Sequence, residues 1–335
     1  MAASREAVAI RRPLAEANPA RFAPDLARSL NNLSVLLSDA GDGAGALAAI
    51  HEAVEIYRPL AEANPARFGP DLARSLNNLS NRLSDAGDGT GALETIREAV
   101  AIRRRLAEAN PARFEPDLAG SLHNLSNGLS NAGNGTGALE AIREAVVIYR
   151  RLADANPVRF EPDLALSLNN LSVHLSNAGD RTGALDAIRD TAAIRRRLAE
   201  ANPARFEPDL AGSLNNLSLR LSDARDGTGA LAAIREAAVI RRRLAEANPA
   251  RFEPDLAQSL NNLFACLSDA GDGTGALAAI REAAAIYRRL AEANPARFEP
   301  DLARSLRVLA HVLRKAGDIG GAENAAREAE GLDGS

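Results

Sequence analysis

Residues 25–42 read DLARSLNNLSVLLSDAGD, and close copies of this stretch recur along the chain at one spacing. The Ser-Leu pair inside it begins at Ser29, Ser75, Ser121, Ser167, Ser213, Ser259 and Ser305, always 46 residues apart without insertion or deletion. A fixed period of roughly 20–50 residues is typical of repeat architectures, in which each unit packs on its neighbours. We therefore predict a single array of repeats rather than the roughly two or three domains that the length of 335 residues would otherwise indicate.

The leucines of this stretch predict an α-helix. Four of them recur at intervals of 4, 3 and 4 residues, namely Leu26, Leu30, Leu33 and Leu37. This spacing puts all four on one side of a helix. Pro24 suits its first position, because the missing N–H would be unpaired there in any case, and the glycine-rich segment 40–43 predicts its end.

A second helix is predicted from about Ala44 to Glu62. Its apolar side carries Ala46, Leu47, Ile50, Ala53, Val54 and Leu60. Pro65 should stop it, and we expect residues 66–68 to form a loop before the next unit begins. Pro13 and Pro59 fall inside the second helix of their copies, where we expect a kink or an early end.

This unit resembles the tetratricopeptide repeat, and within that family the kinesin-light-chain-like variety. The resemblance is carried by Leu30, Leu33, Ser34, Leu37, Gly41, Ala46, Ile50 and Ala53, together with the string SLNNL at 29–33 and EAV at 52–54. It covers nearly the whole chain, although the period is 46 residues instead of the family's usual length of about 34. The resemblance implies an all-α fold, a right-handed superhelical solenoid of antiparallel helix pairs, with a concave groove that binds peptides.

The two ends differ from the middle. We divide the chain into an orphan second helix (1–16), six full repeats (17–301) and a degenerate, polar capping repeat (302–335). No repeat packs on the outer side of the orphan helix at 1–16. Its apolar residues Ala7, Val8, Ile10 and Leu14 should therefore be more exposed than the residues 46 positions later. Either that helix supports self-association or the chain is part of a longer protein.

Composition excludes several classes of function. Apolar residues are 46% and charged residues 25%, which argues against disorder, and the net charge of −4 argues against a nucleic-acid ligand or an anionic membrane. Arg12 recurs with an acid four residues on, and Arg21 recurs with Asp25, so we interpret both ladders as local ion pairs. The phenylalanines that recur from Phe22 to Phe298 are assigned to the inter-repeat core.

No catalytic, metal or cofactor site is predicted. The four histidines, His51, His123, His174 and His311, occupy four different places in the repeat and show no ligand spacing. Cys266 is the only cysteine and has no base beside it in the sequence, so we expect a packing role and a cytoplasmic location. No apolar run approaches the length of a membrane span.

The side of the first helix opposite the leucines is free to bind a partner. Helical geometry puts residues 28, 31, 32, 35 and 39 there, and the family resemblance places the peptide groove on that side. The candidate partner-binding residues are Arg28, Arg74, Asn31, Asn77, His123, Asn169, Asn215, Asn261, Val35, Asn81, Asn127, Val173 and Leu219. The asparagines have two open explanations: their amides pair with a peptide backbone, or they bond to the neighbouring repeat.

We therefore predict a non-catalytic scaffold that binds a peptide or partner protein. The alternative is a sensor or regulatory repeat array of a larger multidomain signalling protein. An enzyme is disfavoured by the lack of any nucleophile–base, metal or cofactor constellation. An RNA-reading helical repeat is disfavoured by the net charge of −4.

Overall fold

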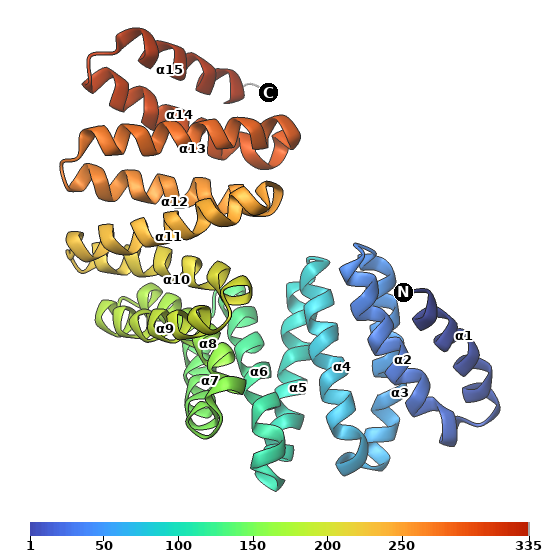
Figure 1. The fold of residues 1–335 in the computed structure, drawn as a ribbon. Coiled ribbons are helices and arrows are strands. Elements are labelled where there is room, and N and C mark those ends of the chain that lie inside the picture. Colours follow the sequence, from blue (N-terminus) through green and yellow to red (C-terminus); the bar gives the residue numbers. More distant parts are fainter. Residues whose placement is uncertain (334–335) are drawn as a thin grey trace. The chain divides into compact units, whose positions relative to one another are not determined.

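The computed structural model describes residues 1–333, which form fifteen α-helices and, within that range, no strand (Figure 1). The bounds are α1 Ala2–Ala17, α2 Pro19–Asp39, α3 Gly43–Ala63, α4 Pro65–Asp85, α5 Gly89–Ala109, α6 Pro111–Asn131, α7 Gly135–Ala155, α8 Pro157–Asn177, α9 Arg181–Ala201, α10 Pro203–Asp223, α11 Gly227–Ala247, α12 Pro249–Asp269, α13 Gly273–Ala293, α14 Pro295–Lys315 and α15 Ile319–Asp333. The all-α class is confirmed. We call α2 and the other even-numbered helices first helices, and the odd-numbered ones second helices.

The helix bounds repeat with the sequence. α2 and α4 begin 46 residues apart, as do α3 and α5, so the predicted period is confirmed in the helices themselves. The first helices, however, begin earlier than predicted. Asn18 caps α2 by accepting a hydrogen bond from the backbone N–H of Arg21 at 3.3 Å, and Pro19 takes the first helical position.

Pro24 therefore lies within α2, and the predicted loop 66–68 belongs to α4. The stronger signal is the Asn-Pro pair, because it supplies both a side-chain cap and a residue that needs no N–H partner. The predicted early end at Pro13 and Pro59 is also wrong. α3 runs through Pro59 to Ala63 and is 21 residues long, the same length as α5, which has no proline.

Glycines and an aspartate make each tight turn from a first to a second helix. Gly41 has φ +80°, a conformation that glycine adopts without strain, whereas Arg225 holds the same place with φ +62°. Asp42 caps α3 by accepting from the N–H of Gly45 at 2.9 Å. A Cβ on Gly45 would lie 2.6 Å from that carboxylate, so a larger residue here would displace the capping side chain.

The apolar core follows the predicted seam. Leu26, Leu30, Leu33 and Leu37 are all buried. Along the chain, one leucine of a first helix and one isoleucine of a second helix are fully buried in turn. Leu76 and Ile96 are one such pair. Burying each side chain of this size stabilises the fold by about 1.5–3 kcal/mol. The phenylalanines also pack on this core as predicted, although they lie in helices rather than loops.

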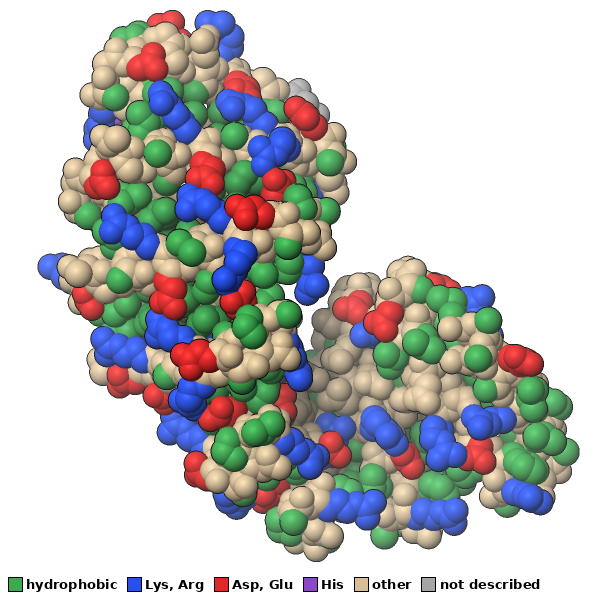
Figure 2. Space-filling view, viewed as in Figure 1, with side chains coloured by type: hydrophobic (Ala, Val, Ile, Leu, Met, Phe, Trp, Pro, Cys, Tyr) green, Lys and Arg blue, Asp and Glu red, His purple; other side chains and the backbone are tan. Residues whose placement is uncertain are grey.

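The first predicted arginine ladder has a different partner, and the arginines of the second also contact aromatic rings. Arg12 pairs with Glu52 at 2.5 Å, 40 residues away on the next second helix, while Glu16 contributes only its charge. The same link joins Arg58–Glu98, Arg104–Glu144, Arg196–Glu236, Arg242–Glu282 and Arg288–Glu328. Arg21 lies over the ring of Phe22, 5.0 Å from its centre, and its equivalents do the same. Figure 2 shows basic and acidic side chains interspersed on the visible face.

The chain forms two compact units, 1–178 and 179 onward, where the sequence predicted a single array. Within each unit every helix packs on the helices before and after it. The first unit contains α1 to α8, and the second contains α9 to α15. The predicted division at residues 16 and 301 is a different one and stays a prediction.

α1 is less covered than its counterpart α3. Ile10 is 57% exposed and Leu14 is 40% exposed, whereas Ile56 and Leu60 are half-buried. Val8 is an exception, because it is buried like Val54. None of the described helices has an apolar stretch long enough to cross a membrane.

Candidate peptide-binding face

The first-helix face is the side of the first helices that carries Arg28, Asn31, Val35 and their equivalents in later repeats. Its outer positions are open to solvent. Val35 is 45% exposed, Val173 40% and Leu219 38%. Arg28, Arg74 and Asn127 are also exposed, and Asn81 is half-buried. These predicted candidates therefore lie at a surface, and the side chains at corresponding places differ in size and polarity from copy to copy.

The central asparagines of this face are less exposed than their neighbours, because they link consecutive first helices. Asn31 is only 7% exposed. Its Oδ1 accepts from the hydroxyl of Ser75 at 3.3 Å and from the Nδ2 of Asn78 at 3.1 Å, both on α4. The second asparagine of one repeat is thus the donor to the first asparagine of the repeat before it.

The same network recurs in both units. Asn77 accepts from Ser121 at 3.0 Å and from Asn124 at 3.2 Å. In the second unit, Asn215 accepts from Ser259 at 3.4 Å and from Asn262 at 2.9 Å. Of the two explanations left open by the sequence, inter-repeat bonding therefore accounts for the Oδ1 atoms.

The Nδ2 atoms of the first asparagines remain available. No described residue accepts a hydrogen bond from the Nδ2 of Asn31, Asn77 or Asn215. Among the described residues no fully buried side-chain nitrogen or oxygen lacks a partner, so these three amides reach the surface. The inter-repeat bonds fix the orientation of each side chain and leave its N–H groups without an acceptor among the described residues.

Three repeats depart from this pattern. His123 replaces the first asparagine, and its two ring nitrogens lie 3.3 Å from the Ser167 hydroxyl and 3.2 Å from the Asn170 Nδ2. Asn261 donates to Ser305 through Nδ2 at 3.1 Å, so its N–H groups are used within the fold. Asn169 lies half-buried in α8, and its Nδ2 is 3.5 Å from the Oδ1 of Asn170.

A second histidine lies close to the first. His174 on α8 is 7% exposed, and its Nε2 is 2.8 Å from the Ser126 hydroxyl on α6. Burial lowers the pKa of His123 and His174, and the charge of His174 lowers that of His123 further. Both imidazoles are therefore neutral at physiological pH and act as hydrogen-bonding groups of the fold.

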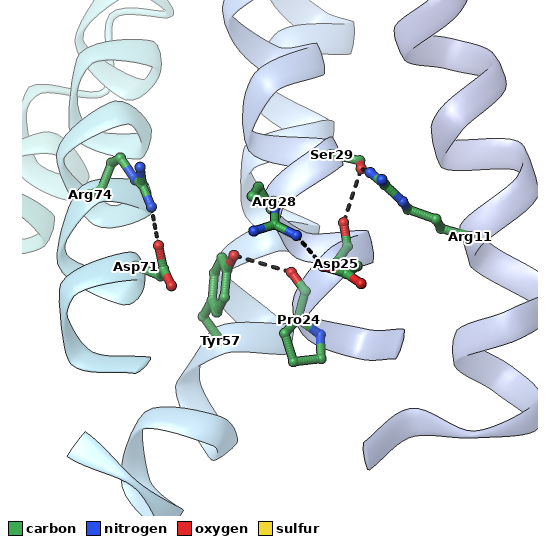
Figure 3. Close-up of polar contacts among 8 residues, drawn as sticks. All are labelled: Arg11, Pro24, Asp25, Arg28, Ser29, Tyr57, Asp71 and Arg74. Carbon is green, nitrogen blue, oxygen red and sulfur yellow. Dashed lines mark hydrogen bonds and ion pairs between the residues drawn. The ribbon is translucent and has the colours of Figure 1, made fainter. Parts of the chain in front are cut away.

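Charge on the first-helix face varies with the repeat. Arg28 pairs with Asp25, and Arg74 pairs with Asp71 in the next copy (Figure 3). The equivalent arginine in α14 is Arg304, which pairs with Asp301 at 3.2 Å. The four copies in between have Gly120, Leu166, Gly212 and Gln258 at this place. Their aspartates therefore have no arginine at that position to neutralise them.

A column that the sequence analysis missed lies beneath this face. At 46-residue spacing it reads Arg11, Tyr57, Arg103, Tyr149, Arg195, Arg241 and Tyr287. Arg103 is 8% exposed and donates to the carbonyl of Asp117 at 2.8 Å and to the hydroxyl of Ser121. Tyr57 donates to the carbonyl of Pro24 at 3.2 Å (Figure 3). Burial raises the pKa of Tyr57 and Tyr287 to about 12, so both stay neutral donors.

Hollows open beside two of these tyrosines at equivalent places. One, of about 390 Å³, lies between α6 and α8 beside Tyr149, with His123 and Leu166 in its wall. The other, of about 550 Å³, lies between α12 and α14 beside Tyr287, with Asn261 and Arg304 in its wall. The two volumes are large enough to accept a peptide side chain, and their linings differ in polarity and charge.

The remaining predicted chemistry can now be placed. Burial raises the pKa of the Cys266 thiol, which disfavours the reactive thiolate. Among the residues that the structure describes, no group of three or more histidine, cysteine or acidic side chains is positioned to hold a metal ion. The aspartates of the glycine-rich turns serve as helix caps.

Solved structures with this fold come from several organisms. BtubC (BKLC) from P. vanneervenii has a TM-score of 0.59 at 25% identity, over 74% of this chain and 91% of that one. A protein of Podosopora anserina described as a kinesin light chain with nearly identical TPR-like repeats has a TM-score of 0.51 at 20% identity, over 67% and 98%. The repeat-sensor protein PH0952 from Pyrococcus horikoshii, a signal transduction ATPase with numerous domains, reaches 0.66 at 11% identity, over 92% and 43%.

A search of curated proteins finds no match. The family model for the tetratricopeptide repeat matches residues 26–61, 72–112, 118–157, 164–204 and 210–250, which together exceed half of the chain. The matched segments coincide with successive first and second helices of the structure. The chain therefore belongs to the tetratricopeptide repeat family.

Proposed function

We propose that this protein is a non-catalytic scaffold that binds an extended peptide segment of a partner protein on the first-helix face. The observation that carries the proposal is that the amides of Asn31, Asn77 and Asn215 are each held in place through Oδ1, while their N–H groups have no acceptor among the described residues. Side-chain amides can pair with the C=O groups of a peptide backbone. Because the fold has already fixed these side chains, a ligand does not have to order them.

Selectivity would come from the positions that change between copies. Val35, Asn81, Asn127, Val173 and Leu219 share the face and differ in size and polarity. The hollows beside Tyr149 and Tyr287 would accept side chains of the bound segment. We propose that the amides provide general backbone binding while these variable positions choose the sequence.

The test separates the outward N–H groups from the inward bonds. A peptide selected by display on the intact protein is titrated against Asn77→Asp and Asn124→Ala. Asn77→Asp keeps an acceptor for Ser121 and Asn124 but removes the N–H donors. It should weaken peptide binding by about tenfold, the loss expected for one hydrogen bond at its upper value, with little change in Tm. Asn124→Ala should lower Tm and weaken peptide binding less than Asn77→Asp does.

The result that would overturn the proposal is equal affinity of Asn77→Asp and the native protein for the selected peptide. Matching variants in the second unit, Asn215→Asp and Asn262→Ala, repeat the test at Asn215. That asparagine makes the same pair of inter-repeat contacts.

Two finer expectations accompany this function. A sensor or regulatory role within a larger signalling protein remains the alternative, and the likeness to the repeat-sensor protein supports it through the fold alone. A cytoplasmic location is compatible with the single free thiol of Cys266.

Self-association through α1 is also proposed, because Ile10 and Leu14 are exposed. Solution scattering would show an apparent mass that rises with concentration. Ile10→Glu with Leu14→Glu should remove that rise, and a constant mass for the unaltered protein would argue against it.

A further inference from the structure

A recurring ion pair joins the two helices of a repeat. Arg289 on α13 pairs with Glu253 on α12 at 2.5 Å, and Arg151–Glu115 and Arg243–Glu207 make the same contact. The arginine is exposed, while the glutamate side chain is only 16–19% exposed. A largely buried carboxylate beneath an arginine is therefore a regular feature of this fold.

One repeat has the arginine of this ion pair but not the glutamate. Arg105 on α5 occupies the arginine place, but the glutamate place on α4 is Gly69. In the preceding copy both residues change together, to Pro59 and Ala23. No described carboxylate lies within 4.0 Å of the Arg105 guanidinium, whose recorded bond is a long one, 3.4 Å, to the carbonyl of Ala101 on its own helix.

The fold does not require glycine at this place. Gly69 is helical, and a Cβ there would lie 3.7 Å from Ile102 and 3.9 Å from Leu106, which is ordinary contact. Beside Gly69 lies a hollow of about 450 Å³ among α3, the start of α4 and α5. Leu72 and Ala61 line the hollow with these three residues, so its wall is mainly apolar.

The other charged groups of this hollow leave Arg105 as the available cation. Arg58 and Glu98, both in its lining, bond to each other at 2.6 Å. Glu62 also lines it and acts electrostatically on Arg58. Relative to the copies that have a glutamate, the hollow therefore lacks one negative charge and one side chain.

We propose that this hollow binds an acidic-aliphatic segment of a partner protein. A glutamate of that segment would supply the carboxylate that Gly69 omits and pair with Arg105. An aliphatic side chain beside it would enter the hollow between Ile102 and Leu106. The site lies on α3, α4 and α5, apart from the amides of the first-helix face, so the protein would have a second interaction surface that does not depend on the first.

The probe is a set of fluorescent, end-blocked peptides of 12 residues with one leucine and one glutamate in a glycine–serine background. The two residues are placed adjacent or separated by one or two positions, and fluorescence anisotropy measures binding. At least one spacing should bind the native protein. Replacing the peptide's glutamate by glutamine should weaken that binding by about fivefold, the upper range for an exposed ion pair.

Three variants locate the site. Gly69→Glu rebuilds the internal ion pair and fills the hollow, so it should abolish binding while keeping or raising Tm. Arg105→Gln should weaken binding by about fivefold. Arg243→Gln is the matched control, because it breaks the equivalent pair with Glu207 and leaves this hollow intact. Asn77→Asp should not affect binding of these peptides, which distinguishes this site from the first-helix face.

Three outcomes would overturn the proposal. The first is that no peptide of the set binds, and the second is that Gly69→Glu binds as well as the native protein. The third is that octanoate, which has the same carboxylate and alkyl chemistry, binds in a Gly69→Glu-sensitive manner while every peptide fails. That result would assign the hollow to a small amphiphile instead of a protein segment.

Discussion

Consecutive repeats are linked on their two sides by different chemistry. On the second helices the links are ion pairs such as Arg242–Glu282, whose side chains are about 40% exposed. On the first helices the links are neutral hydrogen bonds to asparagines such as Asn215, which is 6% exposed. Both kinds recur every 46 residues. The difference in burial predicts that the two kinds contribute very unequally to stability.

The physical reason is solvation. An exposed ion pair exchanges one well-solvated state for another and contributes about 0–1 kcal/mol. A buried amide whose partners would otherwise be left without hydrogen bonds costs about 1–3 kcal/mol to remove. The first helices therefore set the register between repeats, while the second-helix links add small, salt-sensitive increments.

The largest expected effect comes from breaking the first-helix link. Asn215→Ala leaves the Ser259 hydroxyl and the Asn262 amide without their acceptor. Unfolding free energy should fall by about 1–3 kcal/mol, although alanine is the better helix former. Urea unfolding followed by circular dichroism measures it. A variant as stable as the native protein would show that water replaces the lost acceptor.

The buried histidines His123 and His174 should make the first unit, 1–178, sensitive to acid. Folding lowers the pKa of His123 and His174 below 6.5, so the unfolded chain binds protons first as the pH falls. Their contribution to stability is complete above about pH 6.5 and is lost as the pH falls below it. Hydrogen exchange at pH 7 and pH 5 should show greater loss of protection in α6 and α8 than in α12 and α14.

His123→Asn provides the control, because it restores the residue found at this place in other copies. The variant should lose less protection in α6 and α8 at pH 5 than the native protein. An identical loss in both proteins would assign the acid sensitivity to other groups.

A turn offers a gain in stability rather than a loss. Arg225 has φ +62°, where Gly41 and its other glycine equivalents have the same backbone conformation. The left-handed backbone conformation is unfavourable for a residue with a Cβ. Arg225→Gly should therefore raise the free energy of unfolding by about 1 kcal/mol. Thermal unfolding checks the direction. Gly271→Arg in the next turn of that unit is the reverse change and should destabilise by a similar amount.

The sequence predicted the helices better than it predicted their contacts. The leucine spacing and the period identified both helices of each repeat, because burial of one helix face is a local pattern. The start of each first helix was misplaced, since Pro24 resembles a first-turn proline as much as Pro19 does. Weighing Asn18 as a side-chain cap would have decided between them.

Partner assignments failed for a different reason. Arg12 has an acid at Glu16 and another at Glu52, and both recur at the same period. A perfectly regular repeat cannot distinguish a contact within one helix from a contact with the next, because every copy shows both spacings. The structure decides the matter by stacking α1 beside α3. The column of Arg103 and Tyr149 was visible in the sequence, but its burial was not.

The smallest expected effect tests the exposed side of the comparison. Arg242→Gln removes the pair with Glu282, whose formation raises the pKa of Arg242 through a direct hydrogen bond. Because both groups remain in contact with water, unfolding free energy should fall by only about 0.2–1 kcal/mol. The loss should also shrink as salt rises from about 0.05 to 1 M, since the screening length falls to about 3 Å. Asn215→Ala should show no such salt dependence, because the bonds that it removes are neutral. If the two variants instead cost the same and respond alike to salt, the repeats are held equally from both sides, and the first-helix network loses its special role in setting register.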